Sequence, residues 1–352
     1  MPHILQLKGV LGEHLGWHGA RLSFLAMFLI ALLKVKTVNL TEIATALNPL
    51  VKIDSNYRRL QRFFADFELD YDVIARMMAS LLPKPTEGYT LSLDRTNWQL
   101  GQFSINLLVL AIVHQGVAFP VYWSFLAKKG NSNTAERIEL LDKFIATFGR
   151  DCIACLTADR EFIGHKWFKY LRQEKILFRI RIRQNFQVAG KKGQIPVMAI
   201  FQHLAVGQSL VLSRQRLVLG HNLYLIGLRL ENEFLIIATD QLPRTALDDY
   251  AKRWKIETLF GILKSRGFRF EETHLIDGDR INKLLALLAL ATVWAFKMGE
   301  WLHQHQPLKI KKHGRLAKSI FRYGLDHLRS IVFDIQLKMD DFLTALTFLS
   351  CT

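Results

Sequence analysis

The spacing of apolar residues changes along the chain, and each change marks a different kind of structure. Up to about residue 85, apolar positions recur every three or four residues, which is typical of amphipathic helices. From Gly88 onward, apolar and polar residues alternate in short runs, and this period of two predicts β-strands. Helical spacing returns near residue 244 and dominates to the end of the chain.

The helical N-terminal part contains a short helix, a break and a basic helix. Leu40–Leu47 has helical spacing, Asn48–Leu50 interrupts it, and a second helix follows with Ser55 as its N-cap. A helix-turn-helix that binds DNA and an ordinary amphipathic helix with solvated arginines explain this pattern equally well. The basic residues on or near one face of the second helix are Arg58, Arg59 and Arg62.

The middle of the chain interleaves strands with helices. Three β-rich runs between residues 88 and 126 predict a meander of antiparallel strands. A helix is predicted from Thr134 to Phe148, opened by the sequence N-T-A-E, and a buried strand and a helix from His165 to Glu174 follow. This order of elements indicates a mixed α/β layer architecture.

Residues 177–238 lack a helical stretch of useful length. Their apolar positions alternate with polar ones, and Gly193, Gly207 and Gly220 punctuate the runs, which predicts an all-β insertion between two α/β segments. One long helix is then expected from about Arg244 to Ser265, ending near Gly267.

These patterns predict five parts. The expected boundaries are a helical DNA-binding domain at 1–85, the first part of an α/β core at 86–178, the all-β insertion at 179–237, the second part of the core at 238–274, and a helical basic region at 275–352.

Charge narrows the choice of partner. Lys and Arg outnumber Asp and Glu by 47 to 31, which gives a formal net charge of +16 and a pI near 9.8. Such an excess favours a polyanionic partner, because each Lys or Arg near a phosphate releases condensed counterions. Nucleic acid is therefore favoured over a ribosome-associated or membrane-surface role.

Neither membrane insertion nor a disulfide framework is expected. The apolar runs Leu22–Leu33 and Leu284–Phe296 are shorter than the roughly 20 residues of a spanning helix, so both are predicted to be buried core helices. Cys152 and Cys155 form an isolated C-x-x-C within an apolar strand, where they are expected to pack. We expect a protein of the cytoplasm.

Two strand-borne aspartates are candidates for chemistry. Asp94 lies in the middle of the apolar strand LSLDRTNW, and Asp159 ends the strand IACLTA. An unpaired carboxylate is costly in such surroundings, so each needs a partner or a cation. If the two strands are neighbours in one sheet, their oxygens suit Mg²⁺, which prefers carboxylates.

A third carboxylate, Glu257, lies in the expected long helix. Helical offsets of three, four and seven place Tyr250, Arg253, Glu257 and Lys264 on one side of it. Taken alone, Arg253 and Glu257 are better explained as a solvated i,i+4 ion pair.

The spacing of these four residues resembles a known signature. Tyr250, two residues, Arg253, three residues, Glu257, six residues and Lys264 are similar to the Y-R-E-K signature of the insertion-sequence-four family of DDE transposases. Asp94 in the first strand and D-R-E-F at Asp159 resemble the two aspartate motifs of that family. The resemblance covers roughly half of the chain, from Asp94 to Lys264.

The resemblance implies a ribonuclease H-like core interrupted by the all-β insertion. It implies that Asp94, Asp159 and Glu257 coordinate two Mg²⁺ or Mn²⁺ ions for cleavage of transposon ends and strand transfer into target DNA. It also implies that Tyr250, Arg253 and Lys264 hold phosphates of the transposon end. Arg160, beside Asp159, is a further candidate for contact with DNA.

The resemblance has further consequences for partners and for one reaction step. The implied partners are transposon-end and target double-stranded DNA, with a homodimer in the synaptic complex, in the nucleoid of a bacterium or archaeon. A branch of the family forms a DNA hairpin and stacks a flipped base on a tryptophan of the insertion. Because no Trp falls between Phe168 and Arg253, this step is in doubt, although Phe201 or Tyr224 offers an aromatic face.

Two other functions stay open on the sequence. One is a domesticated nuclease on the same fold that cuts without strand transfer, and the other is a catalytically silent protein that occupies transposon ends.

Overall fold

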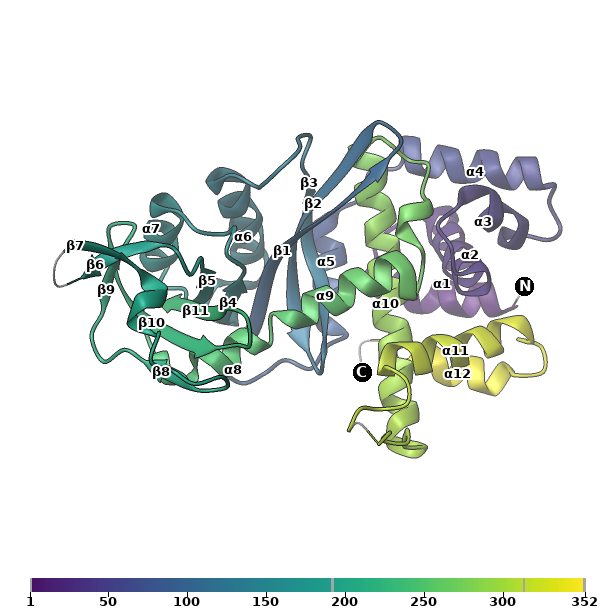
Figure 1. The fold of residues 1–352 in the computed structure, drawn as a ribbon. Coiled ribbons are helices and arrows are strands. Elements are labelled where there is room, and N and C mark those ends of the chain that lie inside the picture. The colour runs from purple at the N-terminus through teal and green to yellow at the C-terminus, as the bar shows by residue number, and fades with distance from the viewer. Residues whose placement is uncertain (1, 191–192, 313, 351–352) are drawn as a thin grey trace. The chain divides into compact units, whose positions relative to one another are not determined.

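The computed structural model describes residues 2–190, 193–312 and 314–350 (Figure 1). Contacts divide the chain into two compact units. The first, here called the helical unit, comprises Met1–Pro83, Trp98–Ile105 and Leu259–Thr352. The second, the sheet unit, comprises Lys84–Asn97 and Asn106–Thr258. The helices of the two chain ends, which the sequence analysis treated as separate regions, therefore share one unit.

The main sheet has nine strands within the described residues. Eight follow the order β3-β2-β1-β4-β5-β11-β10-β8, and the short β9 pairs with β10. A separate two-stranded sheet pairs β6 with β7. The strands are β1 (Tyr89–Leu100), β2 (Phe103–His114), β3 (Val117–Phe125), β4 (Ile153–Ala158), β5 (Phe178–Ile182), β6 (Gln187–Gly190), β7 (Gly193–Pro196), β8 (Ser209–Val211), β9 (Arg216–Val218), β10 (His221–Arg229) and β11 (Phe234–Thr239).

Strand directions in this sheet are mixed. β2 and β3 are antiparallel, as the predicted meander requires, whereas β1 is parallel to β4 and β4 is parallel to β5. A parallel pair needs a crossover connection, and α6 (Thr134–Phe148) and α7 (His165–Gln173) lie in the connections that lead to β4 and β5. The mixed α/β class predicted from the sequence is confirmed.

Helix α6 begins where its sequence predicts. The side chain of Asn133 accepts a hydrogen bond from the Glu136 amide, and the Glu136 side chain accepts one from the Asn133 amide. This reciprocal capping box satisfies amides that the first helical turn leaves without partners. N-T-A-E therefore marks the start of α6 at the predicted position.

Residues 178–239 contribute strands to the main sheet and form the separate pair of β6 and β7. Within the described residues, this segment holds strands, turns and one 3₁₀ turn at Val197–Ile200, and an all-β insertion stays a prediction. However, β11 pairs antiparallel with β5, and β10 and β8 continue the same sheet beyond β11. Alternation identified the strands but carried no information about which sheet they would join.

The single long helix predicted from Arg244 to Ser265 is wrong. The segment consists of a 3₁₀ turn (Pro243–Thr245), α8 (Ala246–Ala251), a tight turn at 252–253, α9 (Trp254–Gly261) and a π-helical turn (Ile262–Arg266) that ends at Gly267. At the break, the amide of Arg253 donates to the carbonyl of Tyr250, a three-residue step in place of the four-residue step of an α-helix. The offsets that placed Tyr250 and Glu257 on one helical face therefore do not apply.

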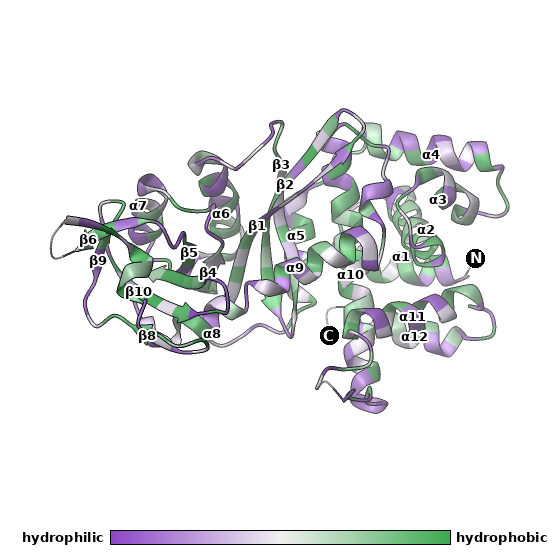
Figure 2. Ribbon diagram, in the orientation of Figure 1, coloured by the Kyte–Doolittle hydropathy of each residue, from purple (hydrophilic) through white to green (hydrophobic). Residues whose placement is uncertain are grey.

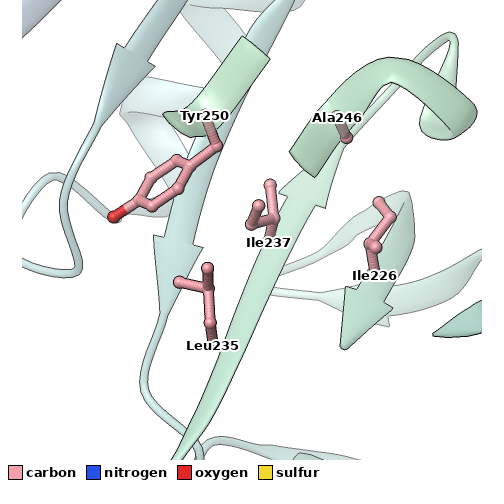
Figure 3. Close-up of a cluster of buried hydrophobic side chains, with 5 residues drawn as sticks. All are labelled: Ile226, Leu235, Ile237, Ala246 and Tyr250. Carbon is pink, nitrogen blue, oxygen red and sulfur yellow. The ribbon is translucent and has the colours of Figure 1, made fainter. Parts of the chain in front are cut away.

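The helix before this break packs against the sheet. Ala246 and Tyr250 of α8 lie in a buried apolar cluster with Ile226, Leu235 and Ile237 of β10 and β11 (Figure 3). All five side chains are almost fully buried. This packing fixes α8 against β10 and β11.

The helical unit is built around two strongly apolar helices. Figure 2 shows the apolar colouring along α2, and α2 and α10 bury most of their side chains. α10 is long and apolar enough to cross a membrane, but 89% of its 18-residue apolar window is buried inside the protein, as in a core helix. α1 and α2 pass the same test only as a pair bent by 115°. The helices are α1 (Pro2–His14), α2 (Gly19–Val35), α3 (Leu40–Leu47), α4 (Ile53–Asp66), α5 (Tyr71–Ser80), α10 (Gly278–His305), α11 (Ile320–Phe333) and α12 (Met339–Thr347), with a 3₁₀ turn at Phe270–Glu272.

The predicted N-cap of the basic helix is wrong. α4 begins at Ile53, so Ser55 lies within its first turn, and its N-cap Lys52 makes no side-chain capping hydrogen bond. Instead, the buried side chain of Asn56 donates to the carbonyls of Ala44 and Asn48. Tertiary contact with the end of α3 thus supports the start of α4 in place of a local cap.

Candidate active site

Asp94 and Asp159 lie at the same end of a parallel strand pair. In β1 and β4, Leu93 is the register partner of Ala158; Asp94 follows Leu93 within β1, and Asp159 follows Ala158 directly after the end of β4. Adjacent strands lie about 4.8 Å apart, so the register alone brings the two carboxylates close together. The structure thus meets the condition under which the two aspartates suit a shared Mg²⁺ ion, namely that their strands are neighbours.

Asp94 is largely buried and receives two hydrogen bonds. Its carboxylate accepts from the Arg95 amide at 2.7 Å and from Nη1 of Arg253 at 3.0 Å. Burial nevertheless raises the pKa of Asp94 to about 7, and the charges of Asp159 and Glu161 add to the rise, while Arg253 and the Arg95 amide oppose it. The negative charge at this position is therefore under-compensated by the protein alone.

Asp159 has a buried tyrosine as its neighbour. The hydroxyl of Tyr250 donates to Oδ1 of Asp159 at 3.3 Å. Burial raises the pKa of Tyr250, and the charge of Asp159 raises it further, so the hydroxyl stays a neutral donor. Tyr250 has no exposed surface. The hydroxyl thus contacts Asp159 from within the core, and a contact between Tyr250 and a DNA phosphate stays a prediction.

Arg253 lies between the other two predicted catalytic carboxylates. Its Nη1 contacts Asp94 at 3.0 Å and its Nη2 contacts Oε1 of Glu257 at 2.6 Å. The Arg253 side chain is 5% exposed, whereas that of Glu257 is 55% exposed. The i,i+4 pair of Arg253 and Glu257 that the sequence favoured is present, and it is extended by a contact with Asp94 that spacing could not show.

The three predicted catalytic carboxylates are of the ligand type that a hard divalent cation prefers. Three carboxylates supply the oxygen ligands that Mg²⁺ and Mn²⁺ accept, and two of them come from adjacent strands. As placed, no three His, Cys, Asp or Glu side chains among the described residues form a metal-binding group. The guanidinium of Arg253 stands between Asp94 and Glu257, so the three can serve together only if it moves.

A polar network ties the two aspartate-bearing segments together. Arg95 donates from Nε and Nη2 to the two oxygens of Glu161 at 3.1 and 3.3 Å. It also donates from Nη1 to Asn106 at 3.0 Å and from Nη2 to Asn131 at 3.3 Å. Because Arg95 follows Asp94 directly and Glu161 lies two residues after Asp159, this ion pair links the two strand ends.

A buried arginine of α6 supports the same loop from the other side. Arg137 donates from Nη2 to the carbonyl of Glu161 at 3.1 Å and from Nε to the hydroxyl of Ser132 at 2.9 Å. Its guanidinium also lies over the ring of Phe162. Nothing in the sequence identified Arg95 or Arg137 as members of the site, because an arginine beside an acidic motif gives no information about its partner.

The remaining predicted DNA-binding residues lie elsewhere. Lys264 belongs to the helical unit, where it pairs with Glu271 at 3.2 Å and lies over the ring of Trp98. Arg160, next to Asp159, is exposed. On α4, Arg58 and Arg62 are exposed, and Arg59 lies half-buried over the ring of Phe24.

Phe201 and Tyr224 were the aromatic residues suggested in place of the tryptophan that stacks a flipped base, and neither is fully exposed. Phe201 is fully buried, and its ring lies 2.4 Å from the position that a Cβ at Gly227 would occupy. The ring thus fills the space that this glycine leaves, so Phe201 cannot stack a flipped base and that suggestion is wrong. Tyr224 is half-buried in β10.

One sizeable hollow of the sheet unit lies away from the carboxylates. It has a volume of about 590 Å³ and is lined by residues that include Gly88, Ala154, Asp249 and Lys252. Gly88 and Ala154 stand at the amino ends of β1 and β4, whereas Asp94 and Asp159 lie farther along these strands. The hollow and the carboxylates are therefore separate features.

Comparison with known proteins identifies one family. The family described as Transposase DDE domain matches residues 89–294, more than half of the chain. The match includes Asp94, Asp159 and Glu257, and it spans the strands and turns that position them. The search of curated proteins found no match.

Proposed function

The chain belongs to the transposase DDE domain family, and on that premise we propose that Asp94, Asp159 and Glu257 are the catalytic carboxylates of a cut-and-paste transposase. A DDE transposase is an enzyme that acts on the phosphodiester bonds of DNA, and DNA is its substrate. We propose these three residues as the ones that carry the reaction, and cleavage and strand transfer as its steps.

The register of β1 and β4 is the observation that carries this assignment. Leu93 pairs with Ala158, so Asp94 and Asp159 lie at neighbouring positions at one end of this strand pair. Arg253 contacts both Asp94 and Glu257. The three carboxylates thus come from separate parts of the chain.

We propose that these carboxylates hold two Mg²⁺ or Mn²⁺ ions. When bound, such ions supply activation of the attacking hydroxyl and stabilisation of the leaving oxygen at phosphorus. The residues around them keep the ligands in place: the Arg95 amide holds Asp94, and the Tyr250 hydroxyl holds Asp159. The role proposed for Tyr250 is therefore to orient Asp159.

The fold and partners of the proposal follow the same family. A three-strand meander followed by parallel strands with helical connections supports a ribonuclease H-like core. The formal net charge of +16 supports double-stranded DNA, both transposon end and target, as partner. We propose a homodimer in the synaptic complex because two ends are joined in concert, and nucleoid DNA of the cytoplasm as its place of action.

Lysines and arginines outside the carboxylate site are proposed to contact DNA phosphates. Arg160 is the nearest in sequence, and it is exposed beside Asp159. Lys264 follows α9 within the signature spacing. On α4, two of three arginines are exposed, which supports a role in end binding for Arg58, Arg59 and Arg62.

A strand-transfer assay tests the proposal. The substrate is a duplex that carries the DNA flanking the reading frame, supplied with a free 3′-hydroxyl at the end of the element, together with supercoiled target plasmid. Joined products that require Mg²⁺ and disappear with a chelator are expected. Cleavage of an uncut end without any joining would identify a nuclease, and end binding without cleavage would identify a silent end-binding protein.

A further inference from the structure

Arg253 and Arg179 are both buried arginines of the sheet unit, but their surroundings differ. Arg179 of β5 donates from Nε and Nη2 to Asp249, from Nη1 to the Gln241 carbonyl, and from Nη2 to the Leu242 carbonyl. All three of its nitrogens are thus engaged by groups of the adjoining turn and helix. Such an arginine is a permanent part of the fold.

Fewer of the guanidinium nitrogens of Arg253 than of Arg179 have hydrogen-bond partners. Its Nη1 and Nη2 contact Asp94 and Glu257, but its buried Nε has no hydrogen-bond partner among the described residues. One of its two partners, Glu257, is 55% exposed, and Arg253 itself lies in the turn between α8 and α9. A guanidinium with an unsatisfied donor, on a non-helical turn, is displaced more easily than one with every donor satisfied.

The guanidinium of Arg253 lies between the carboxylates of Asp94 and Glu257, where a bound cation would also lie. Nη1 lies 3.0 Å from Oδ2 of Asp94, and Nη2 lies 2.6 Å from Oε1 of Glu257. A divalent cation at the same carboxylates would be repelled by the guanidinium, and each positive group would weaken binding of the other. The two therefore compete for Asp94 and Glu257.

We propose that Arg253 is a positioning residue that occupies the cation position between Asp94 and Glu257 in the metal-free protein, and that its guanidinium leaves this position when a divalent cation binds. This inference rests on the proposed function. Once displaced, the guanidinium is available for a DNA phosphate, which reconciles its buried ion pairs with the phosphate contact that the signature implies. Binding of metal and exposure of an anion-binding arginine are then one event.

Mn²⁺ binding to the full chain without DNA tests the exchange. The free ion is measured by electron paramagnetic resonance at pH 8 for the wild type, Arg253→Gln and Arg253→Lys. Arg253→Gln removes the competing charge, so its dissociation constant is expected to fall about tenfold. Arg253→Lys keeps the charge but cannot bridge both carboxylates, and is expected to lie between the two. Lys143→Gln, which removes an equal charge from an exposed pair on α6, should bind Mn²⁺ like the wild type.

Each outcome has a separate consequence. Mn²⁺ affinity in Arg253→Gln that is equal to or weaker than that of the wild type overturns the exchange. Mn²⁺ affinity in Asp94→Asn that equals the wild type overturns the proposed carboxylate site, whatever Arg253 does. An absence of Mn²⁺ binding in the wild type overturns both.

A second measurement does not depend on whether Arg253→Gln folds. The Arg253 guanidinium lies 5.9 Å from the ring centre of Trp254, which is 43% exposed. Mg²⁺ does not itself quench tryptophan fluorescence. When Mg²⁺ is titrated into the protein, displacement of the guanidinium should therefore change the fluorescence of Trp254. We expect a saturable change in the wild type that is lost in Trp254→Phe. Saturable Mg²⁺ binding with a signal unchanged by Trp254→Phe would overturn the exchange.

Discussion

Nη1 of Arg253 lies 3.0 Å from Oδ2 of Asp94, although 159 positions separate the two residues in the sequence. This contact joins the edge of the parallel strands to the turn between α8 and α9. The same arginine reaches Glu257 with its other terminal nitrogen. One side chain thus connects the strand-borne and helix-borne parts of the proposed active site.

Tyr250→Phe should lower cleavage several-fold and leave DNA binding unchanged. The substitution removes the hydroxyl that orients Asp159 and keeps the ring in the apolar cluster. Loss of one such hydrogen bond costs about 1 kcal/mol of folding free energy. Equilibrium binding of end DNA over a range of salt concentrations provides the check. A weaker affinity with a salt slope reduced by about one would instead identify Tyr250 as a phosphate ligand.

Glu161→Gln should reduce cleavage about tenfold and lower the free energy of unfolding by about 1–3 kcal/mol. The charge of Glu161 holds Arg95 in a pair whose side chains are 21% and 15% exposed. Without it, the ends of β1 and β4 are less firmly linked. Cleavage rate and urea denaturation are measured on the same preparation.

A double-mutant cycle with Arg95→Met separates this link from a general loss of stability. Because the two side chains act as one unit, the double variant should cost little more than either single variant. Additive losses would contradict the link. Glu139→Gln breaks an exposed i,i+4 pair on α6 and should change stability by less than about 0.5 kcal/mol.

Arg179→Met should be strongly destabilising, by about 3–5 kcal/mol, because it leaves the polar groups of the adjoining turn and Asp249 without their shared donor. The midpoint of urea unfolding measures the loss. Arg181→Met, two residues along the same strand, breaks a pair whose partner Glu233 is 41% exposed, and should cost much less. Equal losses in the two variants would contradict the role assigned to Arg179.

Local patterns predicted much of the fold. The meander of β1 to β3, the boundaries of α6 and its capping box, and the buried helices α2 and α10 follow from periodicity and capping residues that act within a few positions. Each of these features depends on interactions within one element or between consecutive ones. Two short strand motifs also identified Asp94 and Asp159 as candidates, whereas their neighbouring positions depend on the register of β1 and β4, which no local pattern specifies.

The errors arose where distant contacts override local preference. The chain from Arg244 to Ser265 has helical spacing, yet it turns at Arg253, whose side chain contacts Asp94 from another strand. Ser55 suits an N-cap, yet α4 starts earlier, where buried Asn56 contacts the end of α3. The pairing of Arg95 with Glu161 depends in the same way on a register between strands that no local pattern specifies.

Cleavage of transposon-end DNA by single carboxylate variants tests the central claim most directly. Asp94→Asn, Asp159→Asn and Glu257→Gln each remove one ligand charge while keeping side-chain shape, with Asp248→Asn on α8 as an exposed control. In Mg²⁺, each of the three should lose roughly three orders of magnitude or more in cleavage rate and still bind the end DNA, whereas the control should cleave like the wild type. Near-wild-type cleavage by any one of the three would remove that residue from the active site.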